Sequence, residues 1–278
     1  MTATAVSSRS MLAPVHVDPS IHLSLRGVGK VFHSANGDFT ALKGVDLDIG
    51  RGEFLSLLGP SGCGKSTVLR CLAGLDDVSS GLLTMNGMPV SGPPEALGVV
   101  FQRDVLLDWR TVIDNVLLPV EFAGGGKARA AAMRNKAMQL LQMVGLGDFV
   151  DRFPWQLSGG MRQRAAICRA LLDDPELLLM DEPFGALDEF TRDQLNLELH
   201  RLWASSGKTI VFITHGISEA ILLSNRVAVM GRNPGHIVEV VDIDLPRERT
   251  LQLRDTPRFA AYSAHIRSIF DRMGMGSA

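Results

Sequence analysis

Alternating apolar and polar residues mark the first predicted strands of the chain. Residues 21–25 (Ile-His-Leu-Ser-Leu) and 42–49 (Leu-Lys-Gly-Val-Asp-Leu-Asp-Ile) follow this two-residue period. The pattern predicts half-exposed strands of an antiparallel sheet. Residues 82–85 (Leu-Leu-Thr-Met) precede Asn86-Gly87, which predicts a strand that enters a tight hairpin turn.

Continuous apolar runs predict strands of a second kind. These runs cover residues 53–58, 99–101, 177–180, 209–214 and 226–230. Strands that are buried on both faces and alternate with helices belong to mostly parallel sheets. The runs therefore predict an α/β fold built on a parallel sheet.

The pattern becomes helical in the middle of the chain. Residues 111–150 read as helices with a break at the glycines 124–126, and residues 160–172 read as a further helix. Gly145 fits a C-terminal cap, and one helical face is apolar. That face carries Met133, Ala137, Leu140, Leu141 and Val144. We expect an α-helical subdomain at about residues 103–160, inserted between core strands.

A glycine-rich loop lies between a predicted strand and a predicted helix and completes the motif G-x-x-x-x-G-K-[ST]. Glycines let the backbone curl around phosphates, and N–H groups at a helix N-terminus hold their charge. Lys65 adds a cation, and the Ser66 hydroxyl is placed to bind Mg²⁺. The context predicts a nucleotide-binding P-loop instead of a chance Gly-Ser loop. Its residues are Gly59, Pro60, Ser61, Gly62, Cys63, Gly64, Lys65, Ser66 and Thr67.

Two carboxylates follow the apolar run at residues 177–180. Asp181 is placed to reach Mg²⁺ directly or through water. Glu182, one residue further on, is placed to polarise an attacking water. An Asp-Glu pair can also be an ordinary loop start, but beside a complete P-loop it predicts a magnesium ligand and a general base.

The segment Leu-Ser-Gly-Gly-Met-Arg-Gln at residues 157–163 indicates which class of P-loop protein this is. Ser158, Gly159 and Gly160 at the start of a predicted helix form a second phosphate-binding N-terminus. The chain here resembles the ATP-binding cassette (ABC) ATPases, whose signature is LSGGQ. Motifs of that family follow in order from about residue 21 to residue 230. Met161 replaces the signature glutamine, with Gln163 close by, and the three phosphate-binding residues are intact.

The resemblance implies further site residues and partners. Phe32 matches the adenine-stacking aromatic, Gln102 the Q-loop glutamine that contacts Mg²⁺, and His215 the switch histidine that holds the γ-phosphate. Residues 186–188 match the D-loop. It also implies a head-to-tail homodimer that encloses two ATP molecules, with the P-loop of one subunit facing Ser158 of the other. For Phe32 a core position stays open, because aromatic residues at strand ends are commonly buried.

Composition bounds these interpretations. The chain has 278 residues, 46% of them hydrophobic, with a net charge of -2, so no polybasic signal points to nucleic acid. Three cysteines without C-x-x-C spacing suit a reducing compartment. Neither a signal peptide nor a membrane span is predicted. We expect a flexible lead at residues 1–20, an ATPase domain at 21–250 and a short helical extension at 251–278, in a soluble protein that reaches the membrane through a partner.

Three classes of P-loop protein compete. A kinase does not need the signature or the D-loop, and soluble ABC proteins of DNA repair or translation usually carry two cassettes or a long coiled coil. The favoured class is the ATPase of an importer, bound through permease subunits to the cytoplasmic face of the inner membrane, with a separate solute-binding protein. Residues 100–112, 180–188 and 233–237 are similar to the nitrate/sulfonate/taurine-type import ATPases. A thiamine-precursor pyrimidine or bicarbonate stays open as the solute.

Overall fold

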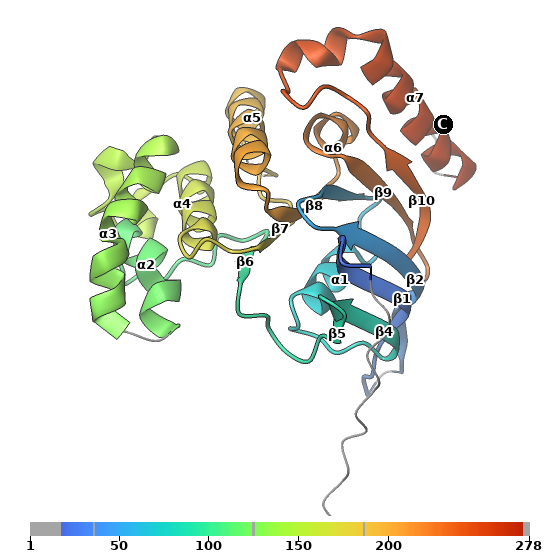
Figure 1. Ribbon diagram of the computed structural model, residues 1–278, viewed down its shortest axis with the longest axis horizontal. Coiled ribbons are helices and arrows are strands. Elements are labelled where there is room, and N and C mark those ends of the chain that lie inside the picture. The colour runs from blue at the N-terminus through green and yellow to red at the C-terminus, as the bar shows by residue number, and fades with distance from the viewer. Residues whose placement is uncertain (1–17, 36, 124–125, 186, 275–278) are drawn as a thin grey trace, which may run out of the picture.

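The computed structural model describes residues 18–35, 37–123, 126–185 and 187–274. Two sheets and a helical part make up this structure (Figure 1). Most of the expected N-terminal lead and residue 186 of the expected D-loop lie outside the described residues.

The larger sheet has six strands in the order β10-β9-β3-β8-β7-β6. Five of them run parallel, and β10 pairs antiparallel with β9 at one edge. The prediction of a mostly parallel sheet is confirmed, and β3, β7 and β8 are buried along their whole length. The strands are β3 (Phe54–Leu58), β6 (Leu97–Val100), β7 (Leu177–Asp181), β8 (Thr209–Thr214), β9 (Arg226–Gly231) and β10 (His236–Asp242).

The smaller sheet is antiparallel, as the alternating pattern predicted. Its order is β2-β1-β4-β5, with β1 (Ile21–Phe32), β2 (Phe39–Gly50), β4 (Ser80–Met85) and β5 (Met88–Pro89). Asn86 and Gly87 form the predicted hairpin turn with φ angles of 53° and 77°, which suit the type I′ turns of two-residue hairpins. Helix α1 (Lys65–Leu72) shares one apolar core with both sheets.

The helical part stands to one side of the sheets in Figure 1. It contains α2 (Val112–Phe122), α3 (Gly126–Met143) and α4 (Gly159–Leu171), which pack around a core of their own. Thr111 caps α2 by accepting a hydrogen bond from the Asp114 N–H. Short 3₁₀ turns at Gly147–Phe149 and Pro154–Gln156 lead into α4. The last strand before these helices, β6, and the first after them, β7, are neighbours in the sheet.

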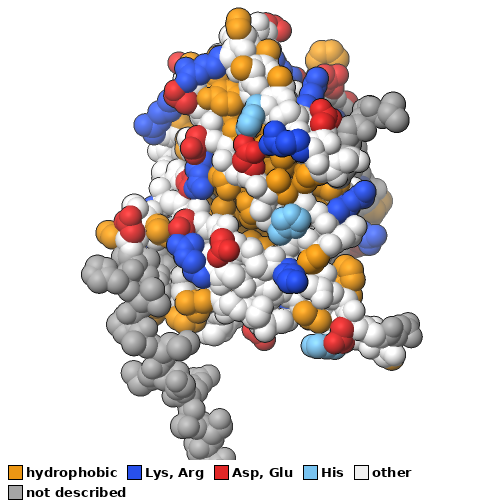
Figure 2. Space-filling model, turned by 90° about the vertical axis from the view of Figure 1, so that its right-hand side faces the viewer, with side chains coloured by type: hydrophobic (Ala, Val, Ile, Leu, Met, Phe, Trp, Pro, Cys, Tyr) orange, Lys and Arg blue, Asp and Glu red, His pale blue; other side chains and the backbone are white. Residues whose placement is uncertain are grey.

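The remaining helices belong to the C-terminal third of the chain. They are α5 (Glu189–Ser206), α6 (Ile217–Leu223) and α7 (Pro257–Arg272), with a 3₁₀ turn at Leu251–Asp255. Helix α7 buries Phe259, Ile266 and Ile269 in a cluster with α6 and β9. On the face shown in Figure 2, acidic and basic side chains are interspersed around a central apolar area. No helix in the described ranges is long and apolar enough to cross a membrane.

Candidate active site

The P-loop connects β3 to α1 at the carboxyl edge of the parallel sheet. Gly62 and Gly64 have φ angles of 76° and 96°, in the left-handed region that favours glycine. A Cβ at Gly59 would lie 2.7 Å from the carbonyl oxygen of Met230, so this position needs glycine for a different reason, the close approach of β9. A pocket of about 420 Å³ lies over the loop, and Ser61, Gly62, Gly64, Lys65, Ser66 and Thr67 line it.

The Lys65 and Cys63 side chains of the P-loop are buried. Lys65 is buried, and its ammonium donates to the carbonyl oxygens of Gly59 and Pro60 at 2.8 and 3.0 Å. Cys63 is fully buried in the apolar core. The Lys65 cation and other P-loop residues therefore line one cavity, and such a loop at a helix N-terminus suits a polyphosphate.

Asp181 ends β7 and is 9% exposed. Its Oδ1 atom is buried without a hydrogen-bond partner in the described part of the chain. Burial raises the pKa of Asp181, and a hydrogen bond from Ser66 opposes this shift. A buried carboxylate oxygen beside a serine hydroxyl fits Mg²⁺, which is held by few protein oxygens together with water and phosphate. Within the described ranges no group of three or more His, Cys, Asp or Glu side chains is placed to hold a metal.

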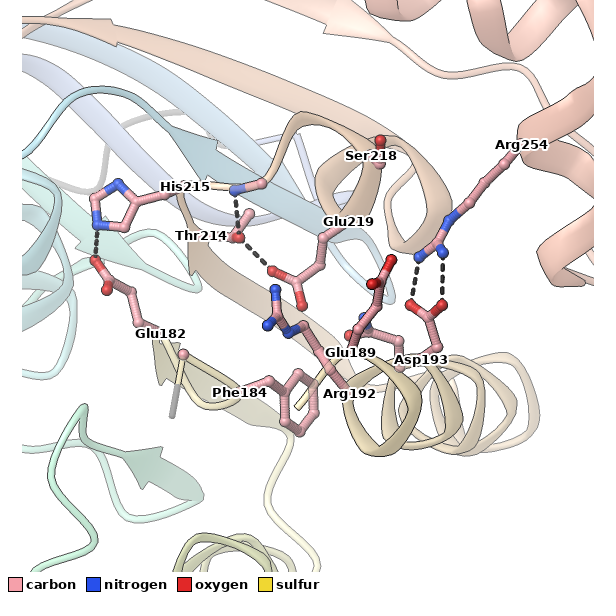
Figure 3. A pocket seen from close by; sticks show the side chains of 13 residues that line it. Glu182, Phe184, Glu189, Arg192, Asp193, Thr214, His215, Ser218, Glu219 and Arg254 are labelled. Atoms are coloured by element: carbon pink, nitrogen blue, oxygen red, sulfur yellow. Dashed lines mark hydrogen bonds and ion pairs between the residues drawn. The ribbon is translucent and has the colours of Figure 1, made fainter. Parts of the chain in front are cut away.

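Glu182, His215 and Gln102 meet at the edge of the pocket, and all three line it. The His215 Nε2 atom lies 2.5 Å from Oε1 of Glu182, and Gln102 Nε2 donates to Oε2 of the same carboxylate at 3.3 Å. The other imidazole nitrogen, Nδ1, lies 3.3 Å from the Gly59 carbonyl oxygen. Figure 3 shows the contact between His215 and Glu182. Three side chains from different loops thus converge beside the P-loop.

A buried network holds the backbone around His215. The Thr214 hydroxyl donates to the carboxylate of Glu219 and accepts a hydrogen bond from the Gly216 N–H at 2.9 Å (Figure 3). Burial raises the pKa of Glu219, and the hydrogen bond from Thr214 opposes this shift. Thr214 and Gly216 flank His215, so the network fixes the loop that carries it.

Two aromatic residues occupy paired positions at the end of the β1–β2 hairpin. Phe32 and Phe39 are directly paired in the antiparallel register. Phe39 lines the P-loop pocket and is 62% exposed, whereas Phe32 is 39% exposed with the Lys30 ammonium 5.1 Å from its ring centre. The exposure of Phe32 disagrees with a core position. Sequence reasoning missed Phe39.

The signature segment forms the start of α4. Ser158 is the N-cap and accepts a hydrogen bond from the Met161 N–H at 3.3 Å, and Gly159 and Gly160 form the first turn. A Cβ at Gly160 would lie 2.5 Å from a methyl carbon of Leu187, so this turn packs closely on the segment before α5. None of the three signature residues lines the P-loop pocket.

Gln163 has a role that its position in the sequence did not suggest. It is buried, and its amide donates to the Phe101 carbonyl oxygen at 3.3 Å. This bond ties α4 to the residue before Gln102. Gln163 therefore points into the structure. The exposed N-terminus of α4 is formed by Ser158, Gly159 and Gly160.

A comparison with protein families decides the class. The model of the ABC transporter family matches residues 42–185, more than half of the chain. The chain belongs to the ABC transporter family. An uncharacterized ABC transporter ATP-binding protein of Methanocaldococcus jannaschii is 45% identical over 232 residues, with 83% of this chain and 86% of that protein covered.

Relatives whose names state a transported solute have a similar sequence identity to this chain. The taurine import ATP-binding protein TauB of Rhizobium johnstonii is 45% identical, with 82% of this chain and 88% of that protein covered. TauB of Yersinia pseudotuberculosis is 43% identical, with 81% and 89% covered. Among solved structures, the dimeric post-hydrolysis state of the cassette MJ0796, bound to ADP and Pi, has a TM-score of 0.71 and 31% identity. The structural match covers 81% of this chain and the whole of the MJ0796 chain.

The ABC family membership settles the fold class and the reaction. The chain is the ATP-binding subunit of an ABC transporter, and it hydrolyses ATP. The predicted P-loop NTPase fold, with its antiparallel sheet and helical part, is confirmed.

Proposed function

We propose that two copies of this ABC subunit associate head to tail and hydrolyse ATP at sites shared between them. The observation that carries this proposal is the separation of the two phosphate-binding helix ends. Ser158 caps an exposed helix N-terminus outside the P-loop pocket of its own chain, and helix N-termini attract phosphate. The solved MJ0796 cassettes of this fold are dimeric.

Each site uses the residues that meet at the P-loop. Ser66, Gln102 and Asp181 would hold Mg²⁺, which would supply positive charge to neutralise the phosphates. Glu182 accepts a proton from the attacking water as the oxygen bonds to the γ-phosphorus and the bond to ADP breaks. His215 contacts the γ-phosphate and, through its contact with Glu182, keeps the base oriented. Phe32 stacks on adenine.

The segment after Gln102 links this site to a membrane partner. The Arg162 Nε atom donates to Asp104 Oδ2 at 2.9 Å, and Arg169 donates to the carbonyl oxygens of Asp104 and Val105 at 3.0 and 2.8 Å. These bonds fasten the segment to α4, the signature helix. Trp109 in the same segment is 74% exposed. An exposed aromatic side chain on a segment that is tied to the signature helix suits contact with a permease subunit.

The transported small solute is an aliphatic sulfonate, taurine or a nitrate-type anion. The two TauB proteins at 45% and 43% identity favour taurine or a related sulfonate. The chain acts at the cytoplasmic face of the inner membrane, through the permease, and a separate solute-binding protein selects the cargo. A thiamine-precursor pyrimidine or bicarbonate is the second candidate, since the solute does not touch this subunit.

The decisive experiment compares Glu182→Gln with Glu189→Gln. Glu189 is an exposed carboxylate at the start of α5 and serves as the matched control. We expect Glu182→Gln to bind ATP, to lose at least about 100-fold in turnover and to form ATP-dependent dimers in light scattering, whereas Glu189→Gln hydrolyses ATP normally. Wild-type turnover in Glu182→Gln contradicts the assigned base. Reconstitution with permease and binding protein, in which taurine, nitrate and a pyrimidine are compared as stimulants of hydrolysis, then identifies the cargo.

A further inference from the structure

A second pocket, of about 530 Å³, lies at the amino edge of the parallel sheet. Four arginines line it, and we call it the arginine pocket: Arg51, Arg226, Arg247 and Arg249. Arg226 begins β9, and Arg51 lies shortly before β3. The P-loop follows the opposite, carboxyl end of β3. The arginine pocket is therefore separate from the nucleotide site.

Arg249 is the unusual member of the arginine pocket. It is 4% exposed, and its only hydrogen bond within the described ranges joins Nη2 to the Ser224 carbonyl oxygen at 3.1 Å. Its Nε and Nη1 atoms are buried without a partner in the described part of the chain. Burial lowers the pKa of Arg249 to about 10, so the guanidinium is still charged at neutral pH. Asp244 acts on this charge only from beyond ion-pair distance and is itself paired with Arg258. A buried charge without a direct counter-ion is costly.

The protein supplies too few carboxylates to balance this charge. Arg226 is paired with Glu53 at 3.1 Å and with Asp242 at 3.5 Å. Arg51, Arg247 and Arg249 have no carboxylate within 4.0 Å in the described ranges. The residues outside those ranges contain no Asp or Glu.

The hydrogen-bond partners of the other two unpaired arginines are neutral. Arg51 donates to the Pro19 carbonyl oxygen and the Asn86 side chain, and Arg247 donates to the Ala204 carbonyl oxygen. Trp203 forms part of the pocket wall, and its indole N–H is already bonded to the Gly52 carbonyl oxygen. Three positive charges and an aromatic wall thus enclose a space without a negative group of its own beyond Glu53, which Arg226 uses.

We propose that the arginine pocket binds a small oxyanion with a sulfate, sulfonate or phosphate head group. Guanidinium groups bind such tetrahedral oxyanions through paired N–H donors. The bound anion offsets the positive charge of Arg249, which lines the pocket, and joins Arg51, before β3, to Arg247 and Arg249, after β10. It thereby fastens the segment that leads into α7 to the parallel sheet, far from the site of ATP hydrolysis.

The test uses the full-length protein saturated with MgADP, so that the P-loop is occupied. Sodium sulfate, inorganic phosphate and methanesulfonate are titrated separately by calorimetry, and sodium chloride of equal ionic strength controls for screening. We expect saturable binding with about one site per chain and a rise of several degrees in melting temperature. The relative affinities of the three anions tell whether a sulfur or a phosphorus oxyanion is the better ligand.

Variants locate the bound anion. Arg51→Gln and Arg247→Gln alter exposed side chains, so they preserve the fold even where Arg249→Gln does not. We expect each to weaken anion binding at least about tenfold, whereas Arg134→Gln, an exposed arginine of α3 with the same charge change, binds as the wild type does. The proposal is overturned if the anions act only as sodium chloride does, or if Arg134→Gln and the pocket variants lose equal affinity.

Discussion

At the scale of single residues, the buried carboxylate of Asp181 trades stability for function. Its pKa is raised by burial, so the folded protein favours the protonated form. This contribution to stability is present below the unfolded pKa near 3.8 and is lost as the pH rises through the folded pKa. At neutral pH the ionised Asp181 therefore destabilises the folded protein, and we expect the proposed Mg²⁺ to offset this cost when it binds.

We therefore expect Asp181→Asn to raise the melting temperature of the nucleotide-free protein at pH 7 by roughly 2–4 °C and to abolish magnesium-dependent ATP hydrolysis. The gain should shrink as the pH falls through the raised pKa of Asp181, because the wild-type carboxyl then becomes protonated. Asp193→Asn is the control, because Asp193 forms a two-bond ion pair with Arg254 and its loss should lower the melting temperature. A lower melting temperature in both variants would contradict the role given to Asp181.

Phe39 is expected to contribute to nucleotide affinity although no motif includes it. Its ring lines the P-loop pocket, and stacking of a base on an aromatic ring is worth about 1–3 kcal/mol. Phe39→Ala should weaken binding of fluorescent ATP roughly tenfold, and GTP equally, because stacking does not recognise base edges. Met88→Ala removes another exposed apolar side chain of the same sheet and should bind ATP normally. If both variants bind equally well, Phe39 is a surface residue without contact to the base.

The residues that sequence reasoning found differ physically from those that it missed. Lys65, Asp181 and His215 belong to short motifs in which local spacing fixes the chemistry. Phe39 reaches the pocket only because the β1–β2 register places it opposite Phe32. Glu219 supports His215 through Thr214, a contact that depends on the packing of α6. Such roles arise from tertiary structure and leave no motif in the sequence.

At the scale of elements, Gly98 sets the distance between α4 and the sheet. A Cβ at this position would lie 2.6 Å from the Ala170 carbonyl oxygen of α4 and 2.9 Å from Leu178 and Pro175. The backbone carbonyl cannot give way without movement of the signature helix. Gly98→Ala should destabilise the protein by about 1–3 kcal/mol and lower its melting temperature by roughly 2–10 °C.

Gly159→Ala is the matched control for this prediction. A Cβ there has its nearest neighbour at 3.9 Å, the end of the Arg162 side chain, and alanine favours helix over glycine. Thermal unfolding of Gly159→Ala should match or exceed the wild type. Equal melting temperatures for Gly98→Ala and the wild type would show that β6 and α4 are not tightly packed.

Periodicity located the strongly patterned elements to within a few residues. The helix expected from residue 160 begins at Gly159, and the strand expected at residues 99–101 spans Leu97–Val100. Strand β10 was not anticipated, because this edge strand is only partly buried and lacks a clear alternation. The order of the strands was also beyond prediction, since β3 lies between β8 and β9 through contacts distant in sequence.

At the scale of the whole molecule, the proposed head-to-tail dimer can be tested by mixing two inactive variants. In a head-to-tail dimer each site combines the P-loop of one subunit with Ser158 of the other. A Lys65→Ala chain lacks a working P-loop, and a Ser158→Arg chain places a bulky cation at the signature end. Each variant alone should be inactive. Their heterodimer, however, keeps one complete site, made of the intact P-loop of the second chain and the intact signature of the first.

Mixing equal amounts of the two inactive variants should therefore restore ATP hydrolysis to roughly a quarter of the wild-type rate, since half of the dimers are mixed and each carries one intact site. The control mixes the Lys65→Ala chain with a double variant that carries both Lys65→Ala and Ser158→Arg. No dimer of those two chains contains an intact P-loop. Hydrolysis is measured by phosphate release after subunit exchange. A mixture as inactive as its control would place the P-loop and its signature partner within one chain, and the head-to-tail dimer would have to be abandoned.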